Sequence, residues 1–212
     1  YSEQLVIFAV DSIAVLTVIQ SRIHEYWSVF FSGTALDLIR YTPSDCFETF
    51  PFPPGRDINP TLEAAGRTYH EFRTDLMVRR DEGLTKTYNR FHDPDEISPD
   101  ILRLRELHAA MDRAVLDAYG WTDLPTGCEF LLDWEDEEDE SGSGRRKKPW
   151  RLRWPDEVRD EVLARLLALN AERAAEEERE GGMAQAGEKP QTRRGRRTRT
   201  TQPGDQGQLD LG

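Results

Sequence analysis

Side chains able to carry proton, metal or thiol chemistry are few in this chain and far apart in its sequence. The 212 residues include four histidines and two cysteines. His24 stands beside Glu25, so an acid–base pair can be drawn, but a histidine in a polar contact between packed helices accounts for it more simply. No two histidines have a convincing metal-ligand spacing, and Cys46 and Cys128 do not form a CxxC pair. The sequence therefore predicts neither a catalytic group nor a metal site.

Basic side chains between two predicted helices indicate a different chemistry, the binding of phosphate groups. The segment Lys86–His92 mixes bases with aromatic residues, so Lys86 and Arg90 are candidate phosphate contacts. The rings of Tyr88 and Phe91 have a second interpretation, in which they anchor the segment to a helical core and leave the bases as solvated flanks.

A second basic cluster lies near the C-terminus and suits sequence-independent phosphate contact. It contains Arg193, Arg194, Arg196 and Arg197. A solubilising tail, or a tail that pairs with an acidic run of the same chain, explains this cluster equally well.

The overall charge argues against wholesale nucleic-acid binding, because the formal net charge is -12 and phosphate contacts need clustered bases. The charge is strongly segregated, however. Glu129–Glu140 holds eight acids and no base, Arg145–Lys148 is entirely basic, and Lys189–Thr200 holds six bases and no acid. With 37% hydrophobic and 32% charged residues, a substantial share of the chain is not expected to join a core.

The elements that must position these bases are mostly helices with capping residues at their ends. Predicted helices run from Asp11 or Ser12 to about Phe31, from Asn59-Pro60 to Gly83, from Ser98-Pro99 to Gly120, and from Pro155-Asp156 to about Glu180. A polar loop, Leu84–Pro94, is predicted between the second and the third. The fold class expected is therefore mainly α.

The start of the chain is the most apolar stretch, and its first part predicts a short buried strand, Leu5–Ala9. Asp11 interrupts the run up to Ile19, which is shorter than the roughly 20 residues that span a bilayer. No basic segment precedes it, so a signal peptide is not predicted. Together with the unpaired cysteines, this favours a cytoplasmic protein without a membrane segment.

The segment Tyr41–Pro54 has four prolines and four aromatic residues in fourteen positions. Each proline favours extended geometry in the residue before it and gives no donor to a sheet. We call residues 41–54 the strap, and we expect Phe47, Phe50 and Phe52 to need a surface to pack against. The alternative is a proline-rich interdomain linker with incidental aromatic residues.

The strap resembles a signature of large single-chain adenine-specific DNA methyltransferases, namely the type IIL restriction–modification enzymes and related phage-defence methyltransferases. Further segments resemble that family in the same order. They are Leu5–Ser12, Gln20–Trp27, Gly83–His92, Leu116–Trp121 and Trp154–Leu163. The resemblance covers roughly residues 5–178.

The resemblance implies an N6-adenine methyltransferase that takes its methyl group from S-adenosylmethionine and flips the target adenine out of the duplex. The family's Asn-Pro-Pro-Tyr-type tetrapeptide and its Gly-rich methyl-donor loop are not in this sequence. We therefore expect a C-terminal piece of such an enzyme, without catalytic activity or a cofactor of its own. Its expected partners are double-stranded DNA, the N-terminal methyltransferase domain and other defence-system proteins, and Arg22 and Arg40 become further candidate phosphate contacts.

The predicted organisation has five parts in order. They are the end of a target-recognition region with a strand remnant and the strap (1–55), a small helical domain (56–128), a disordered charged linker (129–150), an amphipathic helix (151–180) and a disordered basic tail (181–212). A competing hypothesis is a standalone helical module that recruits a partner protein through the amphipathic helix.

Overall fold

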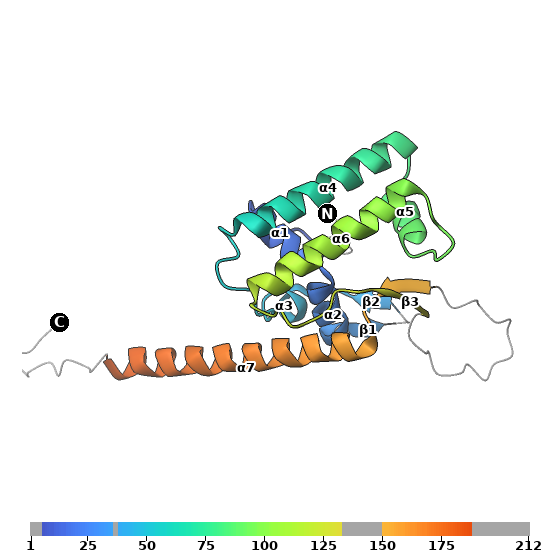
Figure 1. The fold of residues 1–212 in the computed structure, drawn as a ribbon. Helices are drawn as coiled ribbons and strands as arrows, with labels where there is room; N and C mark the ends of the chain where they lie inside the picture. The colour runs from blue at the N-terminus through green and yellow to red at the C-terminus, as the bar shows by residue number, and fades with distance from the viewer. Residues whose placement is uncertain (1–5, 36–37, 133–149, 188–212) are drawn as a thin grey trace, which may run out of the picture. The chain divides into compact units, whose positions relative to one another are not determined.

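The computed structural model describes residues 6–35, 38–132 and 150–187, and it is mainly helical with short strands (Figure 1). The predicted mainly-α fold class is confirmed. The chain divides into two compact units, residues 1–174 and residues 175–212. The first unit contains all of the strands and every helix except the end of the last one.

The first predicted helix is in fact two helices, α1 (Ile13–Gln20) and α2 (Arg22–Phe31), which meet at Ser21. Ser21 has extended backbone angles, φ -75° and ψ 159°. The backbone N–H of Arg22 donates to the Asp112 carboxylate at 3.0 Å. A tertiary hydrogen bond thus replaces a helical one at this point, and the predicted continuous helix is broken there.

The predicted strand at Leu5–Ala9 is wrong within the described residues, because the chain from Val6 onward has no regular structure before α1. The short strands of this region lie after α2 instead. They are β1 (Gly33–Ala35) and β2 (Leu38–Arg40), which pair antiparallel.

The strap is only partly extended, because its first half forms a short helix, α3 (Pro43–Cys46). Proline at the first helical position loses no hydrogen bond, since the first N–H groups of a helix have no partner within it. Beyond this turn Phe50 and Phe52 are buried and Phe47 is half-buried. The expectation that these rings pack against a surface is therefore confirmed, and the surface belongs to this chain.

Two long helices begin at their predicted caps, α4 (Pro60–Arg80) and α6 (Pro99–Ala118). The Asn59 side chain accepts from two backbone N–H groups in the first turn of α4. The predicted end of α4 at Gly83 is too late, because the helix stops at Arg80 and Asp81 follows at φ 50°.

Helix α1 packs closely against α4 at Gly66, where the lack of a side chain leaves room for Thr17. A Cβ atom on Gly66 would overlap the hydroxyl of Thr17. That hydroxyl donates to the carbonyl oxygen of Leu62 at 3.0 Å, so the two helices are also joined by a buried hydrogen bond. Because interiors are close-packed, a methyl group here would have to displace the Thr17 side chain and disturb this hydrogen bond.

The predicted loop at Leu84–Pro94 is largely a helix, α5 (Leu84–Phe91), with Gly83 at its N-cap. Thr87 and Phe91 lie one turn apart and are both buried. The segment was not predicted as a helix because its apolar face is short and the residues around that face are polar.

The two ends of the predicted linker 129–150 form a hairpin of two strands, β3 (Glu129–Leu132) and β4 (Trp150–Arg153). They pair antiparallel, with Leu132 opposite Trp150. The rest of the linker, residues 133–149, lies outside the described residues.

The last helix, α7 (Asp156–Gly187), starts where its proline and acidic first turn predicted. It continues past Glu180, so the first residues of the predicted tail are helical. The remainder of that tail, residues 188–212, lies outside the described residues.

One core joins the parts that the sequence had separated as 1–55, 56–128 and 151–180. Trp27 of α2 and Trp154 before α7 are fully buried in the same cluster as Phe50, Leu62 and Leu116. The first unit therefore has no internal boundary at residue 55, and the strap and helices position one another through shared burial.

Candidate functional site

The most buried charges of the described residues form a network around Arg22, whose side chain is 3% exposed. Its Nη1 donates to Oδ2 of Asp112 at 2.5 Å and to Nδ1 of His108 at 2.7 Å. Its Nη2 donates to the carbonyl oxygen of Leu152 at 3.2 Å. One guanidinium thus links α2, α6 and the β3–β4 hairpin.

His108 lies between the two charges of this network. Its Nδ1 is 2.7 Å from Nη1 of Arg22 and 3.3 Å from Oδ2 of Asp112. Burial alone would lower the pKa of Arg22, but the Asp112 carboxylate outweighs it and raises the pKa above its ordinary value. Burial would likewise raise the pKa of Asp112, while the neighbouring His108 and the charge and backbone N–H of Arg22 hold it below its ordinary value. Both partners therefore remain ionised.

Arg22 is among the predicted phosphate contacts, and the structure corrects that assignment. Its donors are directed to Asp112, His108 and Leu152 inside the protein, and almost none of its surface reaches solvent. Pairing compensates a buried charge that would otherwise be very costly. Arg22 is a structural cation.

The β3–β4 hairpin is tied to the helices through the backbone of Leu152. Its carbonyl accepts from Arg22, and its N–H donates to Nδ1 of His92 at 3.1 Å. His92 follows α5, so the network holds α5 and the hairpin in register with α2.

Burial raises the pKa of the nearby Cys128 thiol to about 11, which keeps it in the unreactive thiol form.

His24 is the other buried histidine, at 3% exposed, and it faces the strap. Its Nε2 lies 3.0 Å from the Tyr41 hydroxyl, and the Phe50 ring packs edge-on against it with centroids 4.7 Å apart. Its Nδ1 has no hydrogen-bond partner. Desolvation lowers the pKa of His24 to about 4, so the imidazole is neutral in the folded protein at pH 7. It is a packing residue, and nothing places Glu25 in an acid–base pair with it.

We expect His24 to make folding sensitive to mild acid. The pKa of His24 is about 4 in the folded state and 6.5 for the free side chain. Between these two pH values the unfolded chain binds a proton at His24 and the folded chain does not. The contribution of the neutral His24 to the free energy of unfolding is therefore fully present above pH 6.5. It is lost as the pH falls toward 4, which lowers the free energy of unfolding by about 2–3 kcal/mol.

Urea unfolding at pH 7.5 and pH 4.5 measures this loss, and the His24→Gln variant should lack that share of it. His70→Gln is the matched control, because His70 is exposed on α4. If His24→Gln and wild type lose equal stability between the two pH values, His24 is not the acid-sensitive group.

Lys86 and Arg90, the predicted phosphate contacts of this segment, lie one turn apart on α5, and each is next to a carboxylate. Lys86 is exposed and its Nζ lies 3.4 Å from Glu82. Arg90 is 19% exposed and contacts both Glu82 at 3.1 Å and Glu96 at 2.7 Å. The hydrogen bond from Arg90 lowers the pKa of Glu96 to about 2, so this pair stays ionised near neutral pH. The Arg90 guanidinium is therefore used in ion pairs within the protein. Of these two bases, Lys86 is the one whose charge is accessible to solvent.

A neighbouring arginine fixes the turn that follows α5. The guanidinium of Arg105 on α6 donates to the backbone carbonyl oxygens of four residues, at distances from 2.7 to 3.3 Å. These residues are Arg90, Phe91, Asp93 and Glu96. Orphan carbonyls at the end of a helix need such donors, so Arg105 holds the helix end and the following loop in place.

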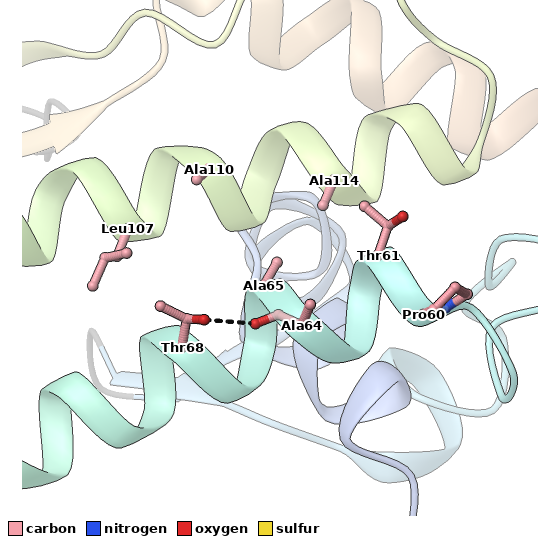
Figure 2. Close-up of a pocket in the computed structure, with 8 residues that line it drawn as sticks. All are labelled: Pro60, Thr61, Ala64, Ala65, Thr68, Leu107, Ala110 and Ala114. Atoms are coloured by element: carbon pink, nitrogen blue, oxygen red, sulfur yellow. Dashed lines mark hydrogen bonds between the residues drawn. The ribbon is translucent and has the colours of Figure 1, made fainter.

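An open groove of about 520 Å³ lies between α4 and α6 (Figure 2). Figure 2 shows small side chains facing it from both helices, and the one hydrogen bond drawn joins the Thr68 hydroxyl to the Ala64 carbonyl within α4. The lining residues are Pro60, Thr61, Ala64, Ala65, Thr68, Leu107, Ala110 and Ala114. None of them is charged or titratable, so the groove offers no group for proton transfer or anion binding.

The other predicted contacts are not positioned by the described side chains. Arg40 ends strand β2, but its side chain is outside the described part. The same holds for the whole basic cluster near the C-terminus, namely Arg193, Arg194, Arg196 and Arg197. The structure thus brings together Lys86 and Arg90 and separates Arg22 from solvent.

Sequence reasoning missed the partners of Arg22, although a signal for them exists. Asp112 and His108 stand one turn apart on α6, beside the apolar stripe that contains Leu104, Met111 and Val115. A charged residue in such an inward position needs a buried partner. That rule predicts a cation opposite Asp112 but does not say which one.

Among residues 6–35, 38–132 and 150–187, no helix is both long and apolar enough to cross a bilayer, and no three potential ligands are grouped to hold a metal ion. Comparisons of the chain with protein-family models, with curated proteins and with solved structures give no match.

Proposed function

We propose that this chain is the C-terminal DNA-recognition and scaffold segment of a site-specific N6-adenine DNA methyltransferase of a restriction–modification or phage-defence system. Methyl transfer belongs to a separate N-terminal domain with its bound S-adenosylmethionine. The chain's own contribution is to grip the duplex and to hold the recognition elements in place.

The observation that carries the proposal is that the six segments of the resemblance contact one another within the first unit, and that four of them share the core around Trp27. The strap is the centre of the first group of contacts. Phe8 packs on Phe47 with ring centroids 5.0 Å apart, and the Tyr119 hydroxyl donates to the Pro51 carbonyl at 3.0 Å. Together with the His24 contact to the strap, these join four of the segments.

The second group of contacts centres on α2. The backbone N–H of Trp154 donates to the Tyr26 hydroxyl at 3.1 Å, and the two rings lie 5.5 Å apart. The Arg22 guanidinium lies 5.9 Å from the centroid of the Phe91 ring. Segments that pack against one another in one fold are expected to occur together in a sequence, which supports a family resemblance over chance similarity of separate segments.

The competing hypothesis of a partner-recruiting module needs a free apolar face on α7. Val162 and Leu166 of that helix are fully buried in the core of the first unit, and Val158 and Leu163 pack against the same core. The apolar side is therefore used within the chain, which favours the scaffold proposal.

The proposal predicts that the isolated 212-residue chain neither binds S-adenosylmethionine nor transfers a methyl group. Calorimetric titration with the cofactor and a tritium-transfer assay on mixed-sequence DNA test this. In parallel, the chain is expressed together with whatever its reading frame encodes upstream, in a host without adenine methylation, and N6-methyladenine is mapped in the host DNA.

Methylation at one sequence motif in the longer product, with none from the isolated chain, is the expected result. Saturable cofactor binding by the isolated chain would contradict the assignment of cofactor binding to a separate N-terminal domain. A longer product without adenine methylation, or a frame without a methyl-donor loop, would favour the interaction module.

A further inference from the structure

Most described bases of the first unit are neutralised by acids, so the surface offers few cations to an anionic ligand. Three exposed or half-exposed examples on different helices have carboxylate partners at 2.6–2.9 Å. They are Arg67 with Glu63, Arg103 with Glu106, and Arg165 with Asp123. An arginine without such a partner is therefore informative here.

Two arginines from distant parts of the chain meet at Phe52 of the strap. The guanidinium carbon of Arg56 lies 4.6 Å from the centroid of the Phe52 ring. Arg173 of α7 donates to the carbonyl oxygen of the same residue at 2.8 Å. Asp57, the neighbour of Arg56, is 3.9 Å from it in an exposed pair, and no described carboxylate pairs with Arg173.

The Tyr119 hydroxyl is bound to the same part of the strap. Burial raises the pKa of Tyr119, and the charges of Arg173 and Arg56 act in the opposite sense. That hydroxyl donates to the carbonyl of Pro51, next to Phe52. Both guanidinium groups thus contact Phe52, one at its ring and the other at its carbonyl oxygen.

The remaining donors of these arginines suit a phosphate. A guanidinium has five N–H donors in a planar fork, and Arg173 directs one of its amino nitrogens to Phe52. Among the described residues Arg56 has the Phe52 ring and, at 3.9 Å, the Asp57 carboxylate as its contacts, which leaves N–H donors for a ligand. Charge-assisted, bidentate contacts of this kind bind phosphate oxygens strongly.

We propose that Arg56 and Arg173 form a phosphate-binding site on the strap, and that its ligand is a phosphodiester of duplex DNA. The DNA assignment rests on the proposed function. The site replaces the interior Arg22 and the acid-paired Arg90 as the place where the described residues hold the DNA backbone.

The test is binding of the full 212-residue chain to a short random-sequence duplex, followed by fluorescence anisotropy over a series of salt concentrations. The variants are Arg56→Gln, Arg173→Gln and their combination. Arg67→Gln is the control, because it removes the same charge from an exposed arginine that is paired with Glu63. Any contribution of residues 188–212 is common to all of these proteins and cancels in the comparison.

The double variant should flatten the slope of log K against log salt by about 2, at about 0.9 for each phosphate that is no longer neutralised. Its affinity at the lowest salt should fall about tenfold or more. The control should stay within error of the wild type. Far-UV circular dichroism shows whether each variant is folded. If the double variant is unfolded, the single variant Arg56→Gln is the test, because it removes no hydrogen bond to the backbone. It should flatten the slope by about 0.9.

Equal slopes for the double variant and Arg67→Gln would overturn the site. A second arm titrates inorganic phosphate and follows the side-chain N–H signals of the two arginines by NMR. If phosphate shifts those signals while duplex affinity is the same in the double variant and the wild type, the ligand is not DNA and the proposal is overturned. Neither readout depends on methyl transfer, so failure here is distinguishable from failure of the methyltransferase proposal.

Discussion

Asp112→Ala is expected to lower the free energy of unfolding by about 3–5 kcal/mol, the usual cost of leaving one member of a buried ion pair without its partner. The carboxylate is fully buried and accepts from both the guanidinium and the backbone N–H of Arg22. Its loss strands a guanidinium that has no route to water. Urea unfolding monitored by circular dichroism measures the change.

The same reasoning predicts rescue by a second substitution. Replacing a buried pair by apolar residues of similar volume is often neutral, so Arg22→Met combined with Asp112→Leu should recover most of the lost stability. Asp117→Ala is the control on the same helix, because Asp117 is 48% exposed in its pair with Arg113 and should cost about 0–1 kcal/mol. If Asp112→Ala costs no more than Asp117→Ala, the network does not hold the fold together.

Phe50→Ala should destabilise the protein by about 3–5 kcal/mol, as large-to-small substitutions of buried aromatic residues do. Phe50 is 4% exposed and packs edge-on against Phe52, with centroids 4.8 Å apart, and against His24. Removing the ring leaves a cavity where the strap meets α2. The melting temperature and the urea midpoint should both fall.

Phe30→Ala provides the comparison for this second prediction, because Phe30 lies on α2 but is 57% exposed. It should change stability by no more than about 0.5 kcal/mol. Equal effects of the two substitutions would mean that the strap is loosely attached, as expected of a linker. A larger effect of Phe50→Ala identifies the strap as part of the core.

The helix starts were predictable because their signals are local. Asn59-Pro60 and Ser98-Pro99 place a capping residue before a proline, and α4 and α6 begin there. The break at Ser21 was not predictable, because it depends on the carboxylate of Asp112, far along the chain. Local pattern cannot report a hydrogen bond that only the tertiary fold brings into range.

The candidate site shows the same division. The bases Lys86 and Arg90 were recognisable from composition, yet their accessibility depended on Glu82 and Glu96, which the fold places beside them. Arg56 carried no motif at all, since its relation to Arg173 exists only once α7 has packed against the strap. Charge in a sequence thus indicates a chemistry, whereas burial and pairing decide whether the charge is free to act.

The pairing of β3 with β4 lets the number of residues between Leu132 and Trp150 change without disturbing the two strands. These residues are opposite each other in the sheet, so whatever connects them begins and ends at one point on the surface. Each doubling of such a connection costs only about 0.6 kcal/mol in closure entropy. The chain can therefore grow or shrink here over generations, or receive an inserted reporter domain, while Leu152 keeps its hydrogen bonds to Arg22 and His92.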